Sequence, residues 1–164
     1  MKINQKQLRE WVEGQDREFL NDIVDLIHIP SVSVETGDAQ APFGIPCREV
    51  LEKVLEIGGR MGFDGKNHEG YCATLLWPGE TEKEIGIFSH MDVVPEGTGW
   101  NYEPYEAVIE DGYVVGRGSS DNKGPAMAAL YALKYLKDSG FTPKHSIRMF
   151  FGVNEECEMK DIVY

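Results

Sequence analysis

The chain has 164 residues, of which 41% are hydrophobic and 27% are charged, a composition typical of a globular domain with its own core. Its formal net charge of −12 argues against nucleic acid and anionic membranes as partners, because both would repel such a surface. The three cysteines are widely spaced, so we expect neither a disulfide framework nor a structural zinc knuckle.

Targeting signals are also missing from the sequence. No apolar run approaches the roughly 18 to 20 residues that cross a bilayer. The first residues lack the apolar centre of a secretory signal. We therefore predict a cytoplasmic protein.

The first half of the chain predicts helices followed by strands. Apolar residues recur at helical spacing from Gln5 to Ile29, with Gly14 as a potential break, and Pro30 ends the pattern. After a predicted loop over residues 34–46, the pattern indicates one helix and three short strands: a helix from Cys47 to Met61, and strands around Phe63, from Tyr71 to Trp77 and from Ile85 to Ser89.

The second half continues the alternation. The turn Glu110-Asp111-Gly112 predicts a hairpin between Tyr105–Ile109 and Tyr113–Val115. An Ala- and Leu-rich helix is expected from Pro125 to Gly140, and a last strand from Ser146 to Val153. Helices that alternate with strands predict a layered α/β fold.

The first candidate site lies where the strand ending at Ser89 meets His90 and Asp92. Residues two apart in an extended chain share a face, so the imidazole and the carboxylate are expected side by side. Metal-bound imidazoles are commonly held by a carboxylate in this way. The alternative is a strand-end histidine capped by a nearby acid.

The second candidate is Asp121, within the Gly-rich segment GRGSSDNKGP. The spacing of the glycines fits neither a phosphate-binding loop nor a dinucleotide-binding turn, and an acid would repel phosphates. The segment instead predicts a turn that places one carboxylate at the amino end of a helix, where the helix dipole favours its charged form. Such a carboxylate can bridge two cations, and the alternative is an ordinary helix cap.

The third candidate is the pair Glu155 and Glu156 after the last strand. Neighbours in an extended chain point to opposite faces, so the two glutamates are expected to have different roles. One can ligate a metal while the other accepts a proton from water. The alternative is a solvated acidic turn. The remaining histidines, His28, His68 and His145, are predicted to be structural.

The order of these motifs resembles the co-catalytic zinc peptidases, a superfamily that includes aminoacylases, acetylornithine and succinyl-diaminopimelate deacylases, glutamate carboxypeptidases and carnosinase-like dipeptidases. The resemblance runs from the helix ending at Ile27 to Glu156. Within it, Ala41-Pro-Phe-Gly44 and Lys123-Gly-Pro125 are most similar to the PepV-type dipeptidases. It implies a three-layer αβα catalytic domain, of which residues 1–164 would be the amino-terminal part, truncated and without the lid domain.

The resemblance also implies roles for the candidate residues. His90 and Glu156 would be metal ligands, and Asp121 would bridge two zinc ions. The peptide bond from Asp121 to Asn122 would be cis. Asp92 would orient His90, and Glu155 would be the general base. The implied reaction is hydrolysis of a dipeptide by a water molecule activated between two zinc ions, which cobalt or manganese could replace.

Two departures from the family pattern qualify the expected activity. Glu158 stands where relatives often have glycine, and the family's further acidic ligand and its last histidine would lie beyond Tyr164. We therefore expect weak zinc binding and little activity from this chain alone. The alternatives are an N-acyl amino acid deacylase, or an inactive module that self-associates through an exposed sheet edge. A small peptide is the expected substrate.

Overall fold

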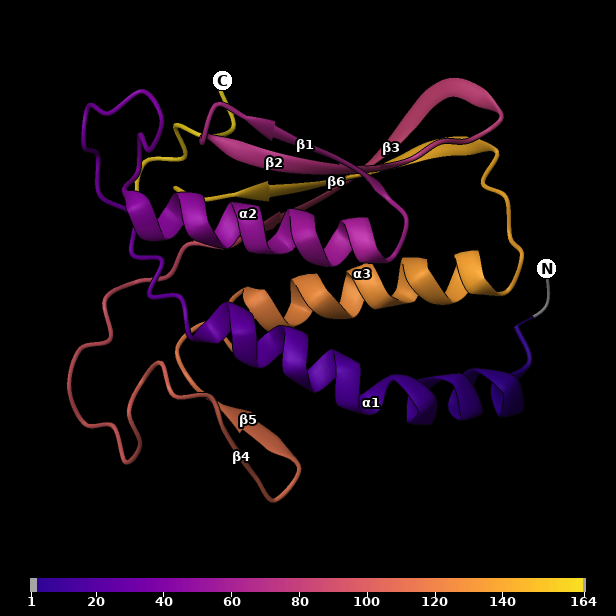
Figure 1. The fold of residues 1–164 in the computed structure, drawn as a ribbon, viewed down its shortest axis with the longest axis horizontal. Coiled ribbons are helices and arrows are strands. Elements are labelled where there is room, and N and C mark those ends of the chain that lie inside the picture. The colour runs from indigo at the N-terminus through magenta and orange to yellow at the C-terminus, as the bar shows by residue number, and fades with distance from the viewer. Residues whose placement is uncertain (1–2, 164) are drawn as a thin grey trace.

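The structure is a computed structural model that describes residues 3–163. Two helices open the chain, five strands follow, and the last helix precedes the last strand (Figure 1). The helices are α1 (Gln5–Ile27), α2 (Ile45–Arg60) and α3 (Lys123–Asp138). The strands are β1 (Asp64–His68), β2 (Cys72–Trp77), β3 (Thr81–His90), β4 (Val108–Glu110), β5 (Tyr113–Val115) and β6 (His145–Gly152).

The main sheet has four strands in the order β1-β2-β6-β3. β6 is therefore central although it comes last in the chain. It pairs antiparallel with β2 and parallel with β3, with His90 opposite Gly152 at the carboxyl ends of the parallel pair. β4 and β5 form a separate hairpin that projects away from the sheet (Figure 1).

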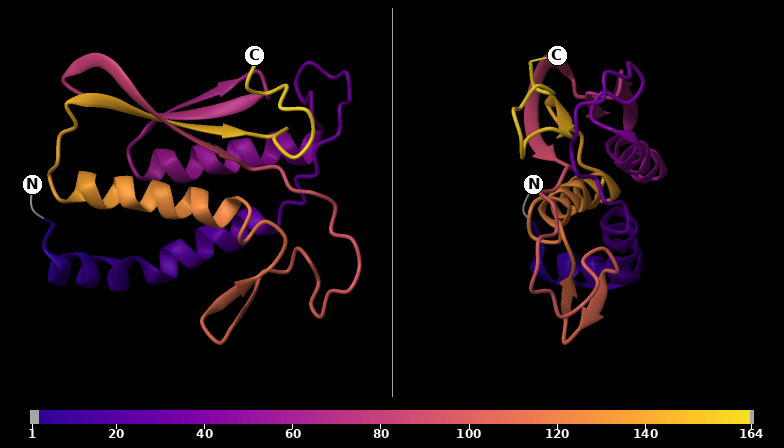
Figure 2. Two further views of the ribbon diagram at one scale, coloured as in Figure 1. Left: turned by 180° about the vertical axis from the view of Figure 1, so that it is seen from behind. Right: turned by 90° about the vertical axis from the view of Figure 1, so that its left-hand side faces the viewer.

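All three helices lie on the same side of the sheet (Figures 1 and 2). α2 and α3 contact the strands, and α1 packs against α2 and α3. On the opposite face of the sheet, the rings of Phe88 and Phe150 stack at a centroid distance of 4.5 Å, and Phe88 is 66% exposed. Within residues 3–163, no helix covers this face.

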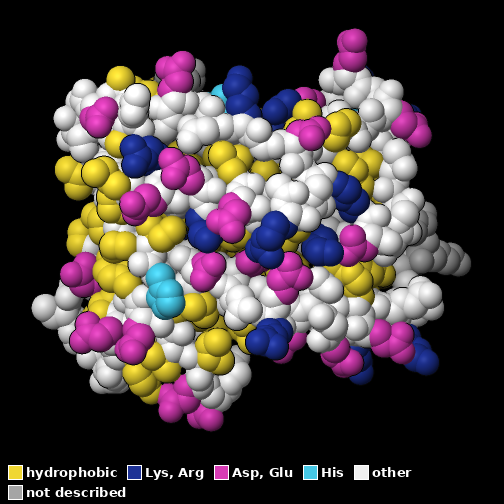
Figure 3. All heavy atoms as spheres, in the orientation of Figure 1, with side chains coloured by type: hydrophobic (Ala, Val, Ile, Leu, Met, Phe, Trp, Pro, Cys, Tyr) yellow, Lys and Arg dark blue, Asp and Glu magenta, His cyan; other side chains and the backbone are white. Residues whose placement is uncertain are grey.

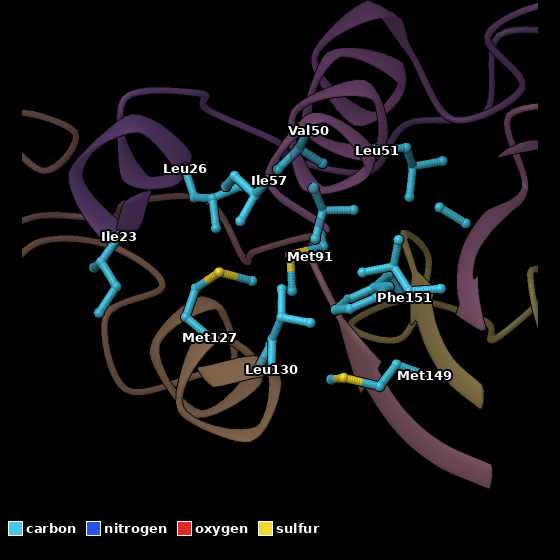
Figure 4. Packing of buried hydrophobic residues seen from close by; sticks show 14 of the residues in the cluster. Ile23, Leu26, Val50, Leu51, Ile57, Met91, Met127, Leu130, Met149 and Phe151 are labelled. Atoms are coloured by element: carbon cyan, nitrogen blue, oxygen red, sulfur yellow. The ribbon is translucent and has the colours of Figure 1, made fainter. Parts of the chain in front are cut away.

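The core fills the space between the sheet and the helices (Figure 4). Met149 and Phe151 of β6 point from the sheet toward Met127 and Leu130 of α3. These side chains are fully buried, so their removal from water supplies the main free-energy gain of this layer. The arrangement confirms the predicted α/β class.

Several boundaries differ from the sequence prediction. Gly14 does not break α1, which runs without interruption because its neighbours on both sides continue the amphipathic pattern. α2 begins earlier than predicted, at Ile45, with Pro46 in its first turn, where the missing N–H has no cost. The hairpin is shorter than predicted, and its turn residues Asp111 and Gly112 both have positive φ.

None of the described helices combines the length and apolarity that a bilayer crossing requires. On the face drawn in Figure 3, lysine and arginine side chains are interspersed among the acidic ones. The net negative charge is thus not gathered into one continuous acidic surface on that face.

Candidate metal centre

The candidate residues meet where two neighbouring parallel strands end. β3 ends at His90 and β6 ends at Gly152, and the two residues are register partners. The pairing continues one step further, because the Met91 amide donates to the Gly152 carbonyl at 2.8 Å. Residues that follow the two strands must therefore emerge side by side, as polar groups at the carboxyl ends of parallel strands commonly do.

Three side chains converge at this edge. One ligand atom from each of His90, Asp121 and Glu156 lies within 4.8 Å of the others. The Nε2 atom of His90 is 3.1 Å from Oδ1 of Asp121 and 3.7 Å from Oε2 of Glu155. The imidazole is buried, whereas the Asp121 side chain is 72% exposed, so the cluster opens to solvent on its carboxylate side.

Asp92 joins the two strand ends. Its side chain is fully buried, and its carboxylate accepts hydrogen bonds from the backbone amides of Glu155 at 3.2 Å and Glu156 at 3.0 Å. On its other side, Asp92 lies beside His90: its carbonyl oxygen is 3.1 Å from Nδ1 and its carboxylate oxygen 3.4 Å. A hydrogen bond donated by His90 Nδ1–H to this carbonyl oxygen directs the Nε2 atom of His90 toward the cluster.

Asp121 reaches the cluster from the loop before α3. The peptide bond between Asp121 and Asn122 is cis, as the resemblance implied. Asn122, not Asp121, is the N-cap residue of α3, and it makes no side-chain capping bond. The alternative of an ordinary helix cap therefore does not describe Asp121, whose carboxylate turns toward His90 instead.

The glutamate pair does not lie in extended chain as predicted. β6 ends at Gly152, and residues 155–158 form turns. Strand alternation therefore does not separate the two side chains, and that argument from the sequence was wrong. Both carboxylates face the same neighbourhood, with Glu155 near His90 and Glu156 within the three-residue cluster.

The negative charges of this cluster favour a positive charge among them. Burial disfavours protonation of His90, but its hydrogen bond with Asp92 and the nearby negative charges outweigh this effect and raise its pKa to about 9. Burial, together with the charge of Asp121, raises the pKa of Glu156. An imidazole nitrogen and carboxylate oxygens form a donor set suited to a divalent metal such as zinc, which would supply positive charge in place of the proton on His90.

The other histidines lie elsewhere. Each has a different partner: Glu106 for His28, Thr74 for His68 and Thr81 for His145. None of the three belongs to the cluster found among the described residues. That they are structural stays a prediction.

Sequence analysis missed the residues that support the site. Asn154 is buried, its side chain donates to Ser33 at 2.8 Å, and its backbone amide donates to the buried carboxylate of Asp161 at 2.9 Å. Lys123 is also completely buried, and burial lowers its pKa to about 7. The only sign of this buried lysine in the sequence is its place in the Gly-rich segment that contains Asp121.

An imidazole surrounded by carboxylates at the ends of parallel strands is an arrangement that could hold a metal ion. Comparison with known proteins shows which families the chain is similar to. Residues 86–162 match the profile of Peptidase family M20/M25/M40. The chain is 38% identical over 144 residues to the putative dipeptidase YtjP of Bacillus subtilis, and 37% identical over 158 residues to the Beta-Ala-Xaa dipeptidase of Lactobacillus delbrueckii subsp. lactis. The chain is thus similar to the M20/M25/M40 peptidase family over residues 86–162 and to bacterial dipeptidases over most of its length.

Solved structures share the fold. Human carnosine dipeptidase 1 matches with a TM-score of 0.78 at 20% identity over 93% of this chain. An M20 family metallo-carboxypeptidase from Sulfolobus solfataricus matches with a TM-score of 0.69 at 25% identity over 85% of the chain. These matches cover 35% and 31% of those structures, and the two bacterial dipeptidases are covered over 31% and 33% of their length. The chain spans about a third of the length of its curated relatives.

The bonds of Asp92 predict the effect of replacing it. In Asp92→Asn, only one oxygen remains for two amide donors, and the new amino group faces an N–H. We expect the free energy of unfolding to fall by about 2–4 kcal/mol, since hydrogen bonds to buried charged groups contribute about 1.5–3 kcal/mol each. Urea unfolding measures the loss, and amide exchange should show faster exchange at Glu155 and Glu156.

Glu155→Gln is the control for this experiment, because it changes a side chain and leaves both amide donors and the Asp92 carboxylate in place. Unchanged exchange at Glu155 and Glu156 in Asp92→Asn would show that Asp92 does not hold the turn.

Proposed function

We propose that this chain carries part of the metal centre of a dipeptidase. The convergence of His90, Asp121 and Glu156 at the strand ends is the observation that supports this proposal most directly. The names of the relatives, which are dipeptidases, favour peptide hydrolysis over the deacylation of N-acyl amino acids.

In the proposed centre, His90, Asp121 and Glu156 would hold the metal, with Asp121 as the ligand shared between two ions. Asp121 lies 3.1 Å from His90 and has an exposed side chain, so its carboxylate is accessible for this role. When bound, zinc supplies Lewis acidity, which polarises a carbonyl oxygen and makes a nearby water easier to deprotonate near neutral pH.

Glu155 is the proposed general base. Its side chain is 43% exposed, so water and substrate can reach it, while its backbone is fixed by Asp92. Its carboxylate would accept a proton from the attacking water and pass it to the leaving amine. Asp92 has no exposed atom for such a transfer and is instead the residue that aims His90.

Zinc binding tests the centre. Because each proposed ligand supplies one of a small set of donors, we expect His90→Ala, Asp121→Asn and Glu156→Gln each to weaken zinc binding by at least about tenfold. Isothermal calorimetry of the folded chain measures this loss.

Glu158→Gln is the matched control, because it removes an acidic group from the same turn. Glu158 pairs with Lys160 and lies outside the three-residue cluster. Equal losses in Glu158→Gln and Glu156→Gln would mean that zinc responds only to the overall negative charge.

Hydrolysis tests the proposed substrate class. With zinc present, we expect Ala-His to be cleaved in preference to acetyl-ornithine and to tripeptides. The rate should be far below that of the Lactobacillus delbrueckii enzyme assayed alongside, because this chain matches only 33% of that enzyme. Glu155→Gln should remove the residual cleavage while zinc affinity stays within about threefold, since carboxamide cannot act as a base. A preference for acetyl-ornithine would instead support a deacylase.

Self-association is a second candidate function, and the open face of the sheet favours it. Phe88 is largely exposed on β3, which is an edge strand of the main sheet, and exposed apolar edges promote pairing between chains. Light scattering with and without zinc should give a mass above that of one chain, which Phe88→Ser lowers.

Tyr113→Ser is the control for that measurement, because Tyr113 is equally exposed but lies on the separate β4–β5 hairpin. A monomeric mass for the unchanged chain would exclude this candidate.

A further inference from the structure

Lys123 is the feature of this fold that the proposed chemistry does not explain. It is the first residue of α3, two positions after Asp121, and its side chain has no exposed surface. A lysine amino group loses its hydration when it is buried, so it needs other hydrogen-bond partners.

Those partners belong to a distant part of the chain. The Nζ atom donates to the carbonyl of Leu26 at 2.8 Å and to the carbonyl of Ile29 at 2.7 Å, at the end of α1. The last turn of α1 contains no basic residue of its own, and the carbonyls at the end of a helix lack partners within it. Lys123 therefore fastens the start of α3 to the end of α1.

The same end of α1 also holds the segment that carries His90 and Asp92. The Ser31 hydroxyl donates to the Met91 carbonyl at 2.6 Å, and the Val93 amide donates to the Ser31 carbonyl at 3.0 Å. Val32 and Val93 form a parallel bridge. The residues at and just after the end of α1 thus contact the end of β3 directly, and they hold the Asp121 loop through Lys123.

The loop is built closely around the lysine. The Lys123 amide donates to the Gly118 carbonyl at 3.0 Å. Gly118 has a φ of +89°, and a Cβ there would lie 3.0 Å from the Lys123 side chain. A Cβ on Gly124 would lie 2.1 Å from the Ser119 carbonyl oxygen. Gly118 lets the loop pack against the lysine stem, and Gly124 lets the start of α3 approach the Ser119 carbonyl.

We propose that Lys123 is a positioning residue, which holds the Asp121 carboxylate at its distance from His90 by anchoring the Asp121 loop to the end of α1. The proposal rests on the proposed metal centre for its functional meaning. The competing explanation is that Lys123 only contributes to overall stability. That explanation predicts no effect on the loop beyond the effect of any equally destabilising core substitution.

Amide exchange of the metal-free chain tests the anchoring directly. Lys123→Met keeps the stem and removes the donors. We expect the protection of the Ser119 and Lys123 amides to fall at least tenfold more than in Leu130→Ala, a core variant of α3 chosen as the stability control. Equal protection of these amides in the two variants would overturn the proposal.

A second pair of variants covers the case in which Lys123→Met does not fold. Gly118→Ala forces a side chain against the lysine stem at a positive φ, whereas Gly140→Ala has a similar φ of +74° and nothing within 4 Å of the new Cβ. Gly118→Ala should loosen the loop amides, and Gly140→Ala should leave them unchanged. Equal effects of the two would again overturn the proposal.

Zinc calorimetry connects the anchor with the metal centre. We expect Lys123→Met to bind zinc at least tenfold more weakly than Leu130→Ala, at a temperature at which both are folded. Binding equal to that of Leu130→Ala would overturn the positioning role while leaving the metal centre intact. Absence of zinc binding by the unchanged chain would refute the metal centre, and with it the functional meaning of the anchor; the exchange experiment would still decide whether the anchor exists.

Discussion

The carboxylate of Asp92 is the constraint on which the candidate site depends. It is buried, and two backbone amides from the other strand end, together with the neighbouring His90 imidazole, share its charge. A buried carboxylate needs such partners, because burying it without them would cost on the order of several kcal/mol of folding free energy. The requirement fixes the distance between His90 and the glutamate turn more tightly than strand pairing alone could.

The polar groups of the site are held by the same layer that forms the core. The strand that ends at His90 packs its inner face against α3, and α3 begins two residues after Asp121. The site therefore lies at one end of a dry core and is open only on its carboxylate side. Rigid packing beneath and solvent above are the conditions that a preorganised cation site needs.

Much of this arrangement follows from the sequence. The periodicity of the apolar residues predicted the three helices and the strands β2, β3 and β6, whereas β1 lies just after Phe63, where a strand was expected. The spacing of His90 and Asp92 predicted that their side chains lie together. The resemblance implied that the glutamates share a centre with His90, but the argument from alternation failed because β6 ends at Gly152 and a turn follows.

Other features could not be predicted from local patterns. Hydrogen bonds from Lys123 to the end of α1 join residues almost a hundred positions apart, and no periodicity signals such a contact. The same holds for the order of strands, because pairing partners in a mixed sheet are chosen by long-range packing. The resemblance to a family supplied the cis peptide, which spacing and composition do not indicate.

The central place of β6 has a consequence for how the chain matures during translation. The β1–β2 hairpin can form early, but it shares no hydrogen bonds with β3, which lies on the far side of β6. Only when residues 145–152 have left the ribosome can the two parts be joined into one sheet. The imidazole of His90 and the glutamate turn acquire their common neighbourhood at that same step, so the candidate site forms once β6 has emerged and not gradually as the preceding strands appear.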